Sequence, residues 1–201
     1  MDDKGLYIVT GATGGIGRAL TEGLCRRGLR VVMACRNTEK AEAIRQRIMR
    51  SGKAGNGEVT VRALDMASLG SIGRFAERIR SEGAEIAALI NNAGVMSGRF
   101  GLTADGIEQC MGVNYVGPYA LTRLLLPMIA DGGRIVNALS VTYRIGRIGP
   151  RPSSPSRNGT DASGATARRS WRCCCSRSSW PGERQDASAS MRPTRAWSIR
   201  A

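Results

Sequence analysis

The stretch "LYIVTGATGGIG", residues 6–17, decides the fold of this chain. Its first four residues are apolar without alternation, which is typical of a strand buried on both faces of a sheet. A glycine-rich turn follows, and the next segment has the spacing of a helix that ends at Gly28. Together they indicate the start of a parallel β-α-β unit. The residues expected on the buried face of the helix are Ile16, Leu20, Leu24 and Cys25.

The same alternation of strand and helix continues to about residue 140. Further strands are expected at "LRVVMA" (29–34), "EVTVRALD" (58–65), "IAALI" (86–90) and "RIVNALS" (134–140), and helices at 37–52, 67–83 and 106–130. The second helix is expected to begin at Asn37 or Thr38. Because this alternation favours parallel pairing through right-handed crossovers, we predict an α/β fold of Rossmann type: a doubly wound parallel sheet of about five strands.

Charge divides the chain into two parts. The net charge of the 201 residues is +14. Residues 1–150 contain 20 Lys and Arg against 13 Asp and Glu, whereas residues 151–201 contain 10 Arg against three acids. Among Val, Ile, Leu and Phe, the second part contains only Ile199. We therefore expect one folded domain, residues 1–150, and a disordered Arg- and Ser-rich tail, residues 151–201.

The spacing of the cysteines and the length of the apolar runs indicate whether the chain binds a metal and in which cellular compartment it is found. Cys25, Cys35, Cys110 and the run at 173–175 have neither the spacing of zinc ligands nor the scatter of a disulfide framework, so no metal site is expected. A reducing, cytoplasmic compartment is favoured. Because the N-terminal residues lack a basic start and no run of about 18 apolar residues occurs, neither a secretion signal nor a membrane span is expected.

The glycine-rich turn is the first candidate for chemistry. In doubly wound sheets, ligands bind beyond the carboxyl ends of the strands, where this turn lies. Gly11 would permit the turn, Gly15 would let the backbone approach a pyrophosphate, and Gly17 would allow close packing of the helix. A turn that is glycine-rich without binding anything is the alternative, which the flanking strand and helix weaken. The residues of this stretch expected to contact a dinucleotide are Thr10, Gly11, Thr13, Gly15, Ile16 and Gly17.

The end of the second strand bears on which dinucleotide is preferred. Sites for NAD usually place an acidic residue there, whereas the 2′-phosphate of NADP needs a cation. Here the sequence reads "MACRN", so Cys35 replaces the acid and Arg36 follows it. Arg18 could be a second phosphate partner. Unless Arg36 is only a solvated surface charge, these residues favour NADP over NAD.

Several motifs in order give the chain a family resemblance. They are "TGATGGIG", "LDM" with Asp65, "NNAG" at 91–94, Asn114 in "GVNYVGPYALTRLLLP", and "RIVNALS" ending in Ser140. Over about residues 4–148 the chain resembles the short-chain dehydrogenases/reductases, and "ACRNTEKAEAIRQRI" is most similar to the retinol dehydrogenase-like branch. That resemblance implies hydride transfer between NAD(P) and a carbonyl compound or secondary alcohol.

The resemblance also implies roles for single residues. Asp65 would contact the adenine, and Asn92, Ala93 and Gly94 would line the nucleotide ribose. Ser140 would hydrogen-bond the substrate carbonyl, and Asn114 would orient a water in a proton relay. Each has a structural alternative: Asp65 as a helix N-cap, Asn114 as a partner of buried backbone, and Ser140 as the end of its strand.

The family's acid-base pair is missing from the expected place. The resemblance implies Tyr-x-x-x-Lys after Ser140, with both residues on one helical face. The last lysine of the chain is Lys53, and Tyr143 with Arg147 is a poor substitute because a planar guanidinium differs from an ammonium. As written, the chain is expected to have little or no turnover, and a non-catalytic NADP-binding module is the alternative.

A reading-frame shift near residues 148–151 is our hypothesis for the tail. Shifted by one base, the codons of Ala165 and Thr166 permit Tyr, and those of Arg169 and Ser170 permit Lys, which restores Tyr-x-x-x-Lys before an apolar helix. Binding of RNA or lipidation of "RCCCSR" has little support, because there is no aromatic platform and no second anchor. A partner-binding tail stays open. Homo-oligomers are expected only if the C-terminal region is intact.

Overall fold

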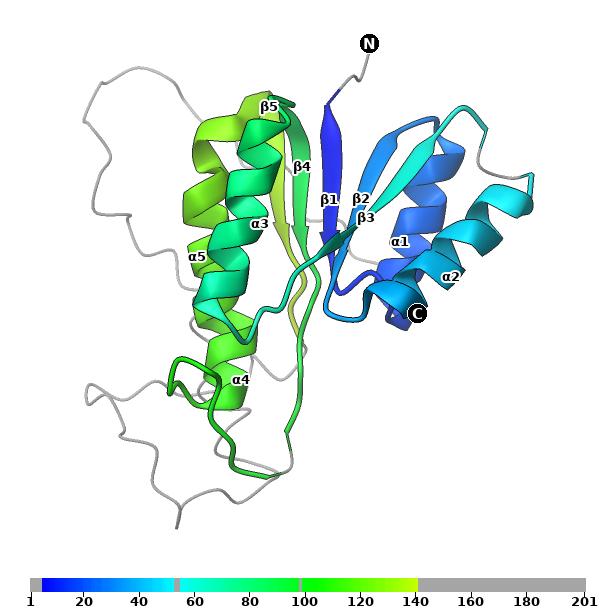
Figure 1. The fold of residues 1–201 in the computed structure, drawn as a ribbon. Helices are drawn as coiled ribbons and strands as arrows, with labels where there is room; N and C mark the ends of the chain where they lie inside the picture. The colour runs from blue at the N-terminus through cyan, green and yellow to red at the C-terminus, as the bar shows by residue number, and fades with distance from the viewer. Residues whose placement is uncertain (1–4, 53–54, 98, 141–201) are drawn as a thin grey trace.

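Five parallel strands form a single sheet in the computed structural model, which describes residues 5–52, 55–97 and 99–140 (Figure 1). Their order is β3-β2-β1-β4-β5, so the chain crosses back over the sheet after β3 and the order reverses between β1 and β4. The predicted α/β class and doubly wound sheet are confirmed. The strands are β1 (Leu6–Thr10), β2 (Arg30–Cys35), β3 (Glu58–Ala63), β4 (Ile86–Asn91) and β5 (Ile129–Asn137).

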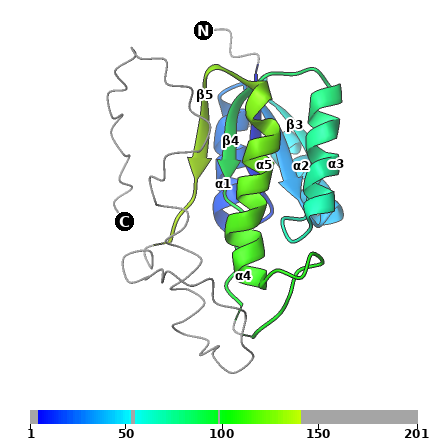
Figure 2. The same cartoon turned by 90° about the vertical axis from the view of Figure 1, so that its left-hand side faces the viewer.

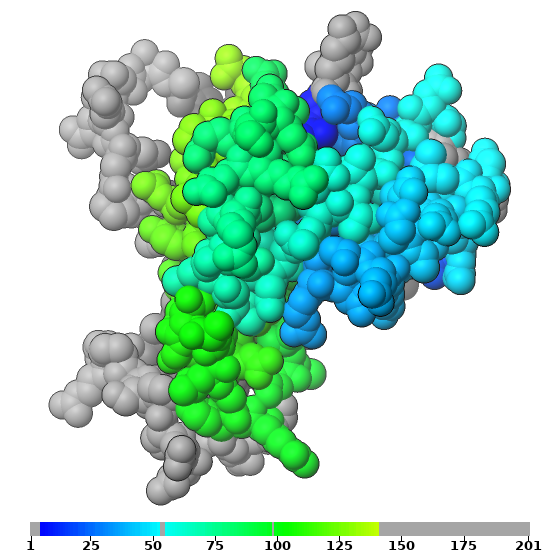
Figure 3. Space-filling model, viewed as in Figure 1, coloured from blue at the N-terminus to red at the C-terminus, as the bar shows by residue number. Residues whose placement is uncertain are grey.

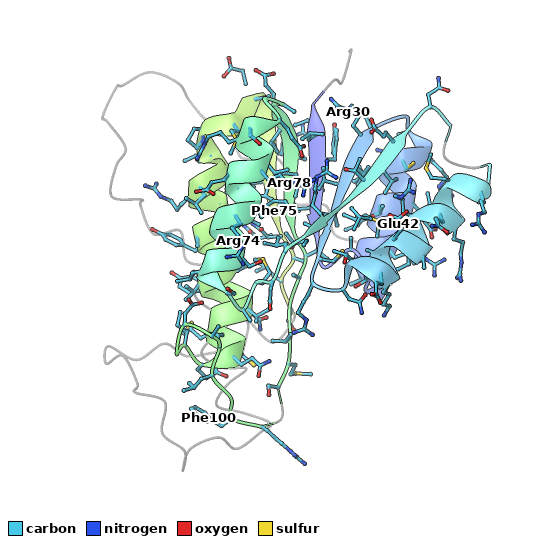
Figure 4. The ribbon with its side chains drawn as sticks, in the orientation of Figure 1. Arg30, Glu42, Arg74, Phe75, Arg78 and Phe100 are labelled. Carbon is cyan, nitrogen blue, oxygen red and sulfur yellow. The ribbon has the colours of Figure 1, made fainter. Side chains whose placement is uncertain are left out.

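Helices cover both faces of the sheet (Figures 1 and 2). Helices α1 (Gly15–Arg26) and α2 (Thr38–Arg50) lie on one face, and α3 (Leu69–Ser81) and α5 (Gly117–Leu125) lie on the other. Successive strand residues point to opposite faces, so Ile8 joins the core beneath α3 and α5 while Val9 joins the core beneath α1 and α2. Phe75, labelled in Figure 4, belongs to the first of these cores.

The helix boundaries follow local signals that the sequence contains. The Asn37 side chain accepts a hydrogen bond from the backbone N–H of Lys40 at 2.7 Å, which identifies Asn37 as the N-cap of α2. Ser68 caps α3 in the same way. Gly28 follows α1 with φ +82°, as the predicted end of that helix requires.

The predicted buried face of α1 is only partly right. Of the four residues expected there, Cys25 is buried and Leu24 packs partly buried against the same core, whereas Leu20 is exposed and Ile16 is 71% exposed. The face toward the sheet consists of Gly17, Thr21 and Cys25. A Cβ on Gly17 would lie 2.5 Å from the carbonyl oxygen of Gly11, so the helix approaches the turn too closely for large side chains. Small size, rather than hydrophobicity, therefore selects the residues of this face.

The long helix predicted at 106–130 is shorter and irregular. It runs through α4 (Gln109–Met111), a π-helical segment η1 (Gly112–Val116), α5, and a 3-10 turn η2 (Leu126–Met128). Asn114 lies in the π-helical segment. Such insertions into α-helices are frequent at functional sites.

The last strand also differs from the prediction. β5 begins at Ile129, five residues before the predicted start, and ends at Asn137. Among the described residues it pairs only with β4, so it forms an edge of the sheet. Most of its side chains are exposed, Val136 by 47%, unlike those of the buried strand β1. This edge strand therefore exposes apolar side chains, among them Ile135 and Val136.

The predicted tail, residues 151–201, and the pair Tyr143 and Arg147 lie outside the described residues. Within the described part of the chain, no helix is both long enough and apolar enough to cross a bilayer.

Candidate functional site

A cavity of about 700 Å³ lies beyond the carboxyl ends of the strands, beside the switch between β1 and β4. Its volume is in the range of small-molecule and cofactor sites. Ten of the eleven residues predicted to contact a dinucleotide line it: Gly11, Thr13, Gly15, Ile16, Gly17, Arg36, Asp65, Asn92, Ala93 and Gly94. Thr10 is the exception. The cavity is also lined by residues that were not predicted to contact a dinucleotide, among them Asn37, Lys40, Met66, Val95, Gln109 and Val113.

The glycine-rich turn forms one wall of the cavity. Gly11 adopts φ +65°, and a Cβ there would lie 2.8 Å from the Cα of Ala93. In contrast, a Cβ on Gly15 would meet nothing within 4 Å, so the backbone of Gly15 is open to the cavity. Among the described residues, the N–H groups of Gly15, Ile16 and Gly17 have no hydrogen-bond acceptor. The start of α1 therefore offers free donors and a partial positive charge to an anion.

Thr10 has a different role from the one predicted. Its side chain is fully buried, and its hydroxyl donates to the carbonyl of Ile90 at 3.3 Å. The same oxygen accepts from the backbone N–H groups of Asn92 at 3.0 Å and Ala93 at 2.9 Å. These bonds use the hydroxyl fully, so Thr10 joins β1 to the end of β4 and does not reach the cavity.

Asn92 supports the turn from the other side. Its side-chain amide donates to the carbonyl of Thr10 at 2.9 Å and to that of Gly11 at 3.4 Å. The two contacts fix the turn against the segment after β4, and this leaves Asn92, Ala93 and Gly94 at the cavity wall. The turn and the "NNAG" segment therefore form one hydrogen-bonded unit.

The tip of β2 carries no negative charge. Cys35 is 3% exposed, and burial raises the pKa of its thiol to about 11, so the thiol is neutral at physiological pH. Arg36 lies next to it at the cavity, exposed. Lys40, in the first turn of α2, lines the same region. Neither cation has an ion-pair partner among the described residues, so both are available to a bound anion.

Lys40 could have been found from the sequence. The N-cap at Asn37 places the next three residues in the first turn of α2, directly after β2. Because only two residues separate the end of β2 from the start of α2, a cation in the first turn of α2 lies close to the end of β2.

Arg18, in contrast, does not belong to the cavity. Its Nε donates to a carboxylate oxygen of Glu22 at 2.8 Å, and the two residues line a separate hollow with Arg26 and Arg47. The prediction of Arg18 as a second phosphate partner is therefore not supported by its position. Because Arg18 follows Gly17 on the helix, its side chain is carried away from the face that meets the turn.

Asp65 lies where β3 leads toward α3. One carboxylate oxygen accepts from the backbone N–H of Ala67 at 2.9 Å, and the backbone N–H of Asp65 donates to the Ser71 hydroxyl at 3.0 Å. Since the N-cap of α3 is Ser68, the alternative of Asp65 as a helix cap is wrong. The second oxygen, Oδ2, has no hydrogen bond to a described residue, and Asp65 lines the cavity.

The two predicted catalytic residues do not line the cavity. Asn114 makes a reciprocal pair of hydrogen bonds with the backbone of Val95: its amide donates to the carbonyl at 2.7 Å, and its oxygen accepts from the N–H at 2.8 Å. Asn114 therefore binds backbone groups, as its structural alternative predicted. Those groups belong to Val95, in the loop after β4, and not to the helix of Asn114 itself. Ser140 is the last described residue and lies three positions beyond β5.

The buried thiol of Cys35 gives a testable dependence of stability on pH. Its pKa is raised from 9.0 to about 11 in the folded chain, so the unfolded chain loses the proton first as pH rises. We expect the free energy of unfolding to fall between about pH 9 and about pH 11, by at most about 1.4 kcal/mol per pH unit for this thiol. Urea titrations across this range should show a shallower fall in Cys35→Val. Equal slopes would contradict the assignment.

Comparison with known proteins places this geometry in a family. The model of the short-chain dehydrogenase family matches residues 6–161. Human retinol dehydrogenase 11 is 43% identical over 145 residues, which is 71% of this chain and 45% of that protein. The chain thus spans less than half the length of such curated relatives.

Solved structures agree with this match. The crystal structure of an uncharacterised protein from Mycobacterium paratuberculosis has 34% identity and a TM-score of 0.68, over 85% of this chain and 57% of that one. A metagenomic short-chain oxidoreductase in complex with NADP has 28% identity and a TM-score of 0.62, over 86% of this chain and 72% of that one. The chain therefore belongs to the short-chain dehydrogenase family.

Proposed function

We propose that the cavity binds NADP(H) in preference to NAD(H). The observation that carries the proposal is the charge at the tip of β2, where Arg36 and Lys40 stand beside a neutral, buried Cys35. An acidic side chain there would hold the ribose hydroxyls of NAD and repel a 2′-phosphate, whereas two cations attract that phosphate. The NADP bound by the metagenomic relative is consistent with this proposal.

The remaining cavity residues suit the other parts of a dinucleotide. The free N–H groups at the start of α1 would hold the pyrophosphate, and the open backbone at Gly15 leaves room for it. Asp65 would accept a hydrogen bond from the adenine through its free oxygen. Asn92, Ala93 and Gly94 would line a ribose, held in place by Thr10.

We further propose an oxidoreductase of the family's general type, which interconverts a carbonyl compound and a secondary alcohol. The bound nicotinamide would supply or accept the hydride. In this chain, Ser140 would hydrogen-bond the substrate oxygen. Asn114 would act through Val95, whose backbone it holds at the cavity wall.

Turnover by the chain as written is a separate question. No lysine follows Lys53 in the sequence, and proton transfer to the substrate oxygen requires a group with a pKa near the working pH. We therefore propose that the chain binds NADP(H) with little or no turnover. We also propose a cytoplasmic, reducing location, which suits the buried thiols of Cys35 and Cys110.

Titration of the purified chain tests these proposals directly. The fluorescence of the nucleotide, followed on titration with NADPH and with NADH, should give an affinity at least about tenfold higher for NADPH. Arg36→Gln should lose most of this preference, because one cation to the 2′-phosphate is removed while NADH binding stays within about threefold. Arg74→Gln, on α3 and outside the cavity, is the matched control.

Further outcomes separate the alternatives. Tight NADPH binding without oxidation in the presence of aldehydes or ketones would support a binding module. Salt-sensitive binding of a random oligonucleotide in place of the dinucleotide would support a nucleic-acid function instead. Equal affinities for NADPH and NADH would contradict the proposed preference.

A further inference from the structure

A short hairpin-like loop lies between β4 and α4 and leads into Gln109, which lines the cavity. The backbone of Leu102 pairs with that of Glu108 in an antiparallel bridge, and the N–H of Thr103 donates to the carbonyl of Ile107 at 2.7 Å. Gly106, with φ +72°, closes the turn. Figure 3 shows this segment in bright green at the lower end of the molecule, and Phe100, labelled in Figure 4, lies just before it in the chain. The loop therefore has a defined shape rather than an open course.

An acidic side chain fixes this loop to a distant helix. Asp105, in the turn, accepts a hydrogen bond from the backbone N–H of Leu69 at 2.8 Å, at the start of α3. A carboxylate at a helix N-terminus is favoured by the helix dipole. The same helix start holds the turn of Asp65 through Ser71. The loop and Asp65 are thus positioned by one element.

Gln109 is the residue that this arrangement brings to the cavity. Its backbone N–H donates to the carbonyl of Gly101 at 2.9 Å, which closes the base of the loop. Gln109 lines the cavity, as do Asp65, Met66 and Val113. Among the described residues, no hydrogen bond involves the side-chain amide of Gln109. An unpaired, partly buried amide in the wall of a cavity that Asp65 also lines is suited to a polar ligand group.

We propose that Gln109 hydrogen-bonds the adenine base of the bound dinucleotide and, with Asp65, reads its polar edge. The inference rests on the proposed NADP(H) site and adds a residue that neither the motifs nor the fold reveals. Adenine presents an amino group that donates and ring nitrogens that accept, and an amide can meet both kinds of atom. Asp105 acts as a positioning residue, because it holds the loop that carries Gln109.

A change of one atom in the side chain tests the contact. Gln109→Glu can still accept from the adenine amino group but can donate nothing to the carbonyl oxygen that replaces it in hypoxanthine. We expect the preference for NADPH over its hypoxanthine analogue, deamino-NADPH, to rise about tenfold above that of the unchanged chain, since the mismatch leaves acceptors facing each other. Any general repulsion by the added charge acts on both ligands and cancels in this ratio.

The control is the same substitution elsewhere. Gln46→Glu, on the exposed side of α2, adds the same charge outside the cavity and should leave the ratio unchanged. Gln109→Leu removes the amide without adding charge, and should weaken NADPH binding about three- to tenfold with an unchanged melting temperature. An unchanged base preference in Gln109→Glu would overturn the inference while leaving the NADP(H) site intact. Absence of NADPH binding by the unchanged chain would instead overturn the proposed function.

Discussion

Replacing Gly17 by Val is expected to abolish detectable dinucleotide binding. A Cβ at this position would lie 2.5 Å from the carbonyl oxygen of Gly11 and 2.7 Å from the amide nitrogen of Asn92. The first atom is backbone and the second is held by two hydrogen bonds, so neither can move without disturbing the turn. We expect a loss of affinity of about 100-fold or more, together with a loss of about 1–3 kcal/mol in stability from overpacking. Fluorescence titration with NADPH and urea unfolding measure the two effects.

The same helix offers a matched control for this change. A Cβ on Gly23 would meet nothing within 4 Å, and its backbone is helical. Gly23→Ala should therefore leave NADPH binding unchanged and stabilise the chain by about 0.5–1 kcal/mol through helix propensity. If Gly17→Val bound NADPH as well as Gly23→Ala does, the close packing of α1 on the turn would not be what shapes the site.

The second large effect is expected from Cys35→Asp, which should reverse the choice of dinucleotide. A carboxylate at the tip of β2 would repel the 2′-phosphate of NADP and could accept hydrogen bonds from the ribose hydroxyls of NAD. We expect the affinity for NADPH to fall about 100-fold and that for NADH to rise several-fold. Equilibrium titrations of both cofactors at one ionic strength measure the change in preference.

Cys35→Asn provides the comparison, because it has the shape of Asp without the charge. It should weaken NADPH binding far less, and it also accounts for the cost of a polar group at a position that is 3% exposed. Should Cys35→Asp and Cys35→Asn favour NADPH to the same degree, charge at this position does not set the preference. The proposal would then rest on Arg36 and Lys40 alone.

The order of strands and helices was predictable because each element carries a local signal. Buried parallel strands appear as apolar runs, Asn37 and Ser68 cap their helices, and Gly11 and Gly28 end segments with positive φ. These signals depend on a few neighbouring residues. Their positions in this sequence were therefore sufficient to predict the sheet and the location of the cavity.

What could not be predicted depends on contacts between distant segments. The approach of α1 to the turn buries Thr21 and exposes Ile16, although hydrophobicity alone suggests the reverse. Thr10 is occupied by backbone from residues more than 80 positions later, so its motif position suggested a ligand contact that its hydrogen bonds exclude. Gln109 carries no signal of its own, because the hairpin and Asp105 place it at the cavity.

The hydrogen bonds of the Thr10 hydroxyl also bear on the order in which parts of the chain can fold during synthesis. During synthesis, the first strand and its glycines emerge well before the fourth strand, and closing so long a loop is entropically costly. The cradle for the ligand can take shape only after residues 90–93 have arrived and bonded to that single oxygen. Before then the turn lacks its contacts with the segment after β4, so we expect a dinucleotide to stabilise the finished topology more than any earlier intermediate.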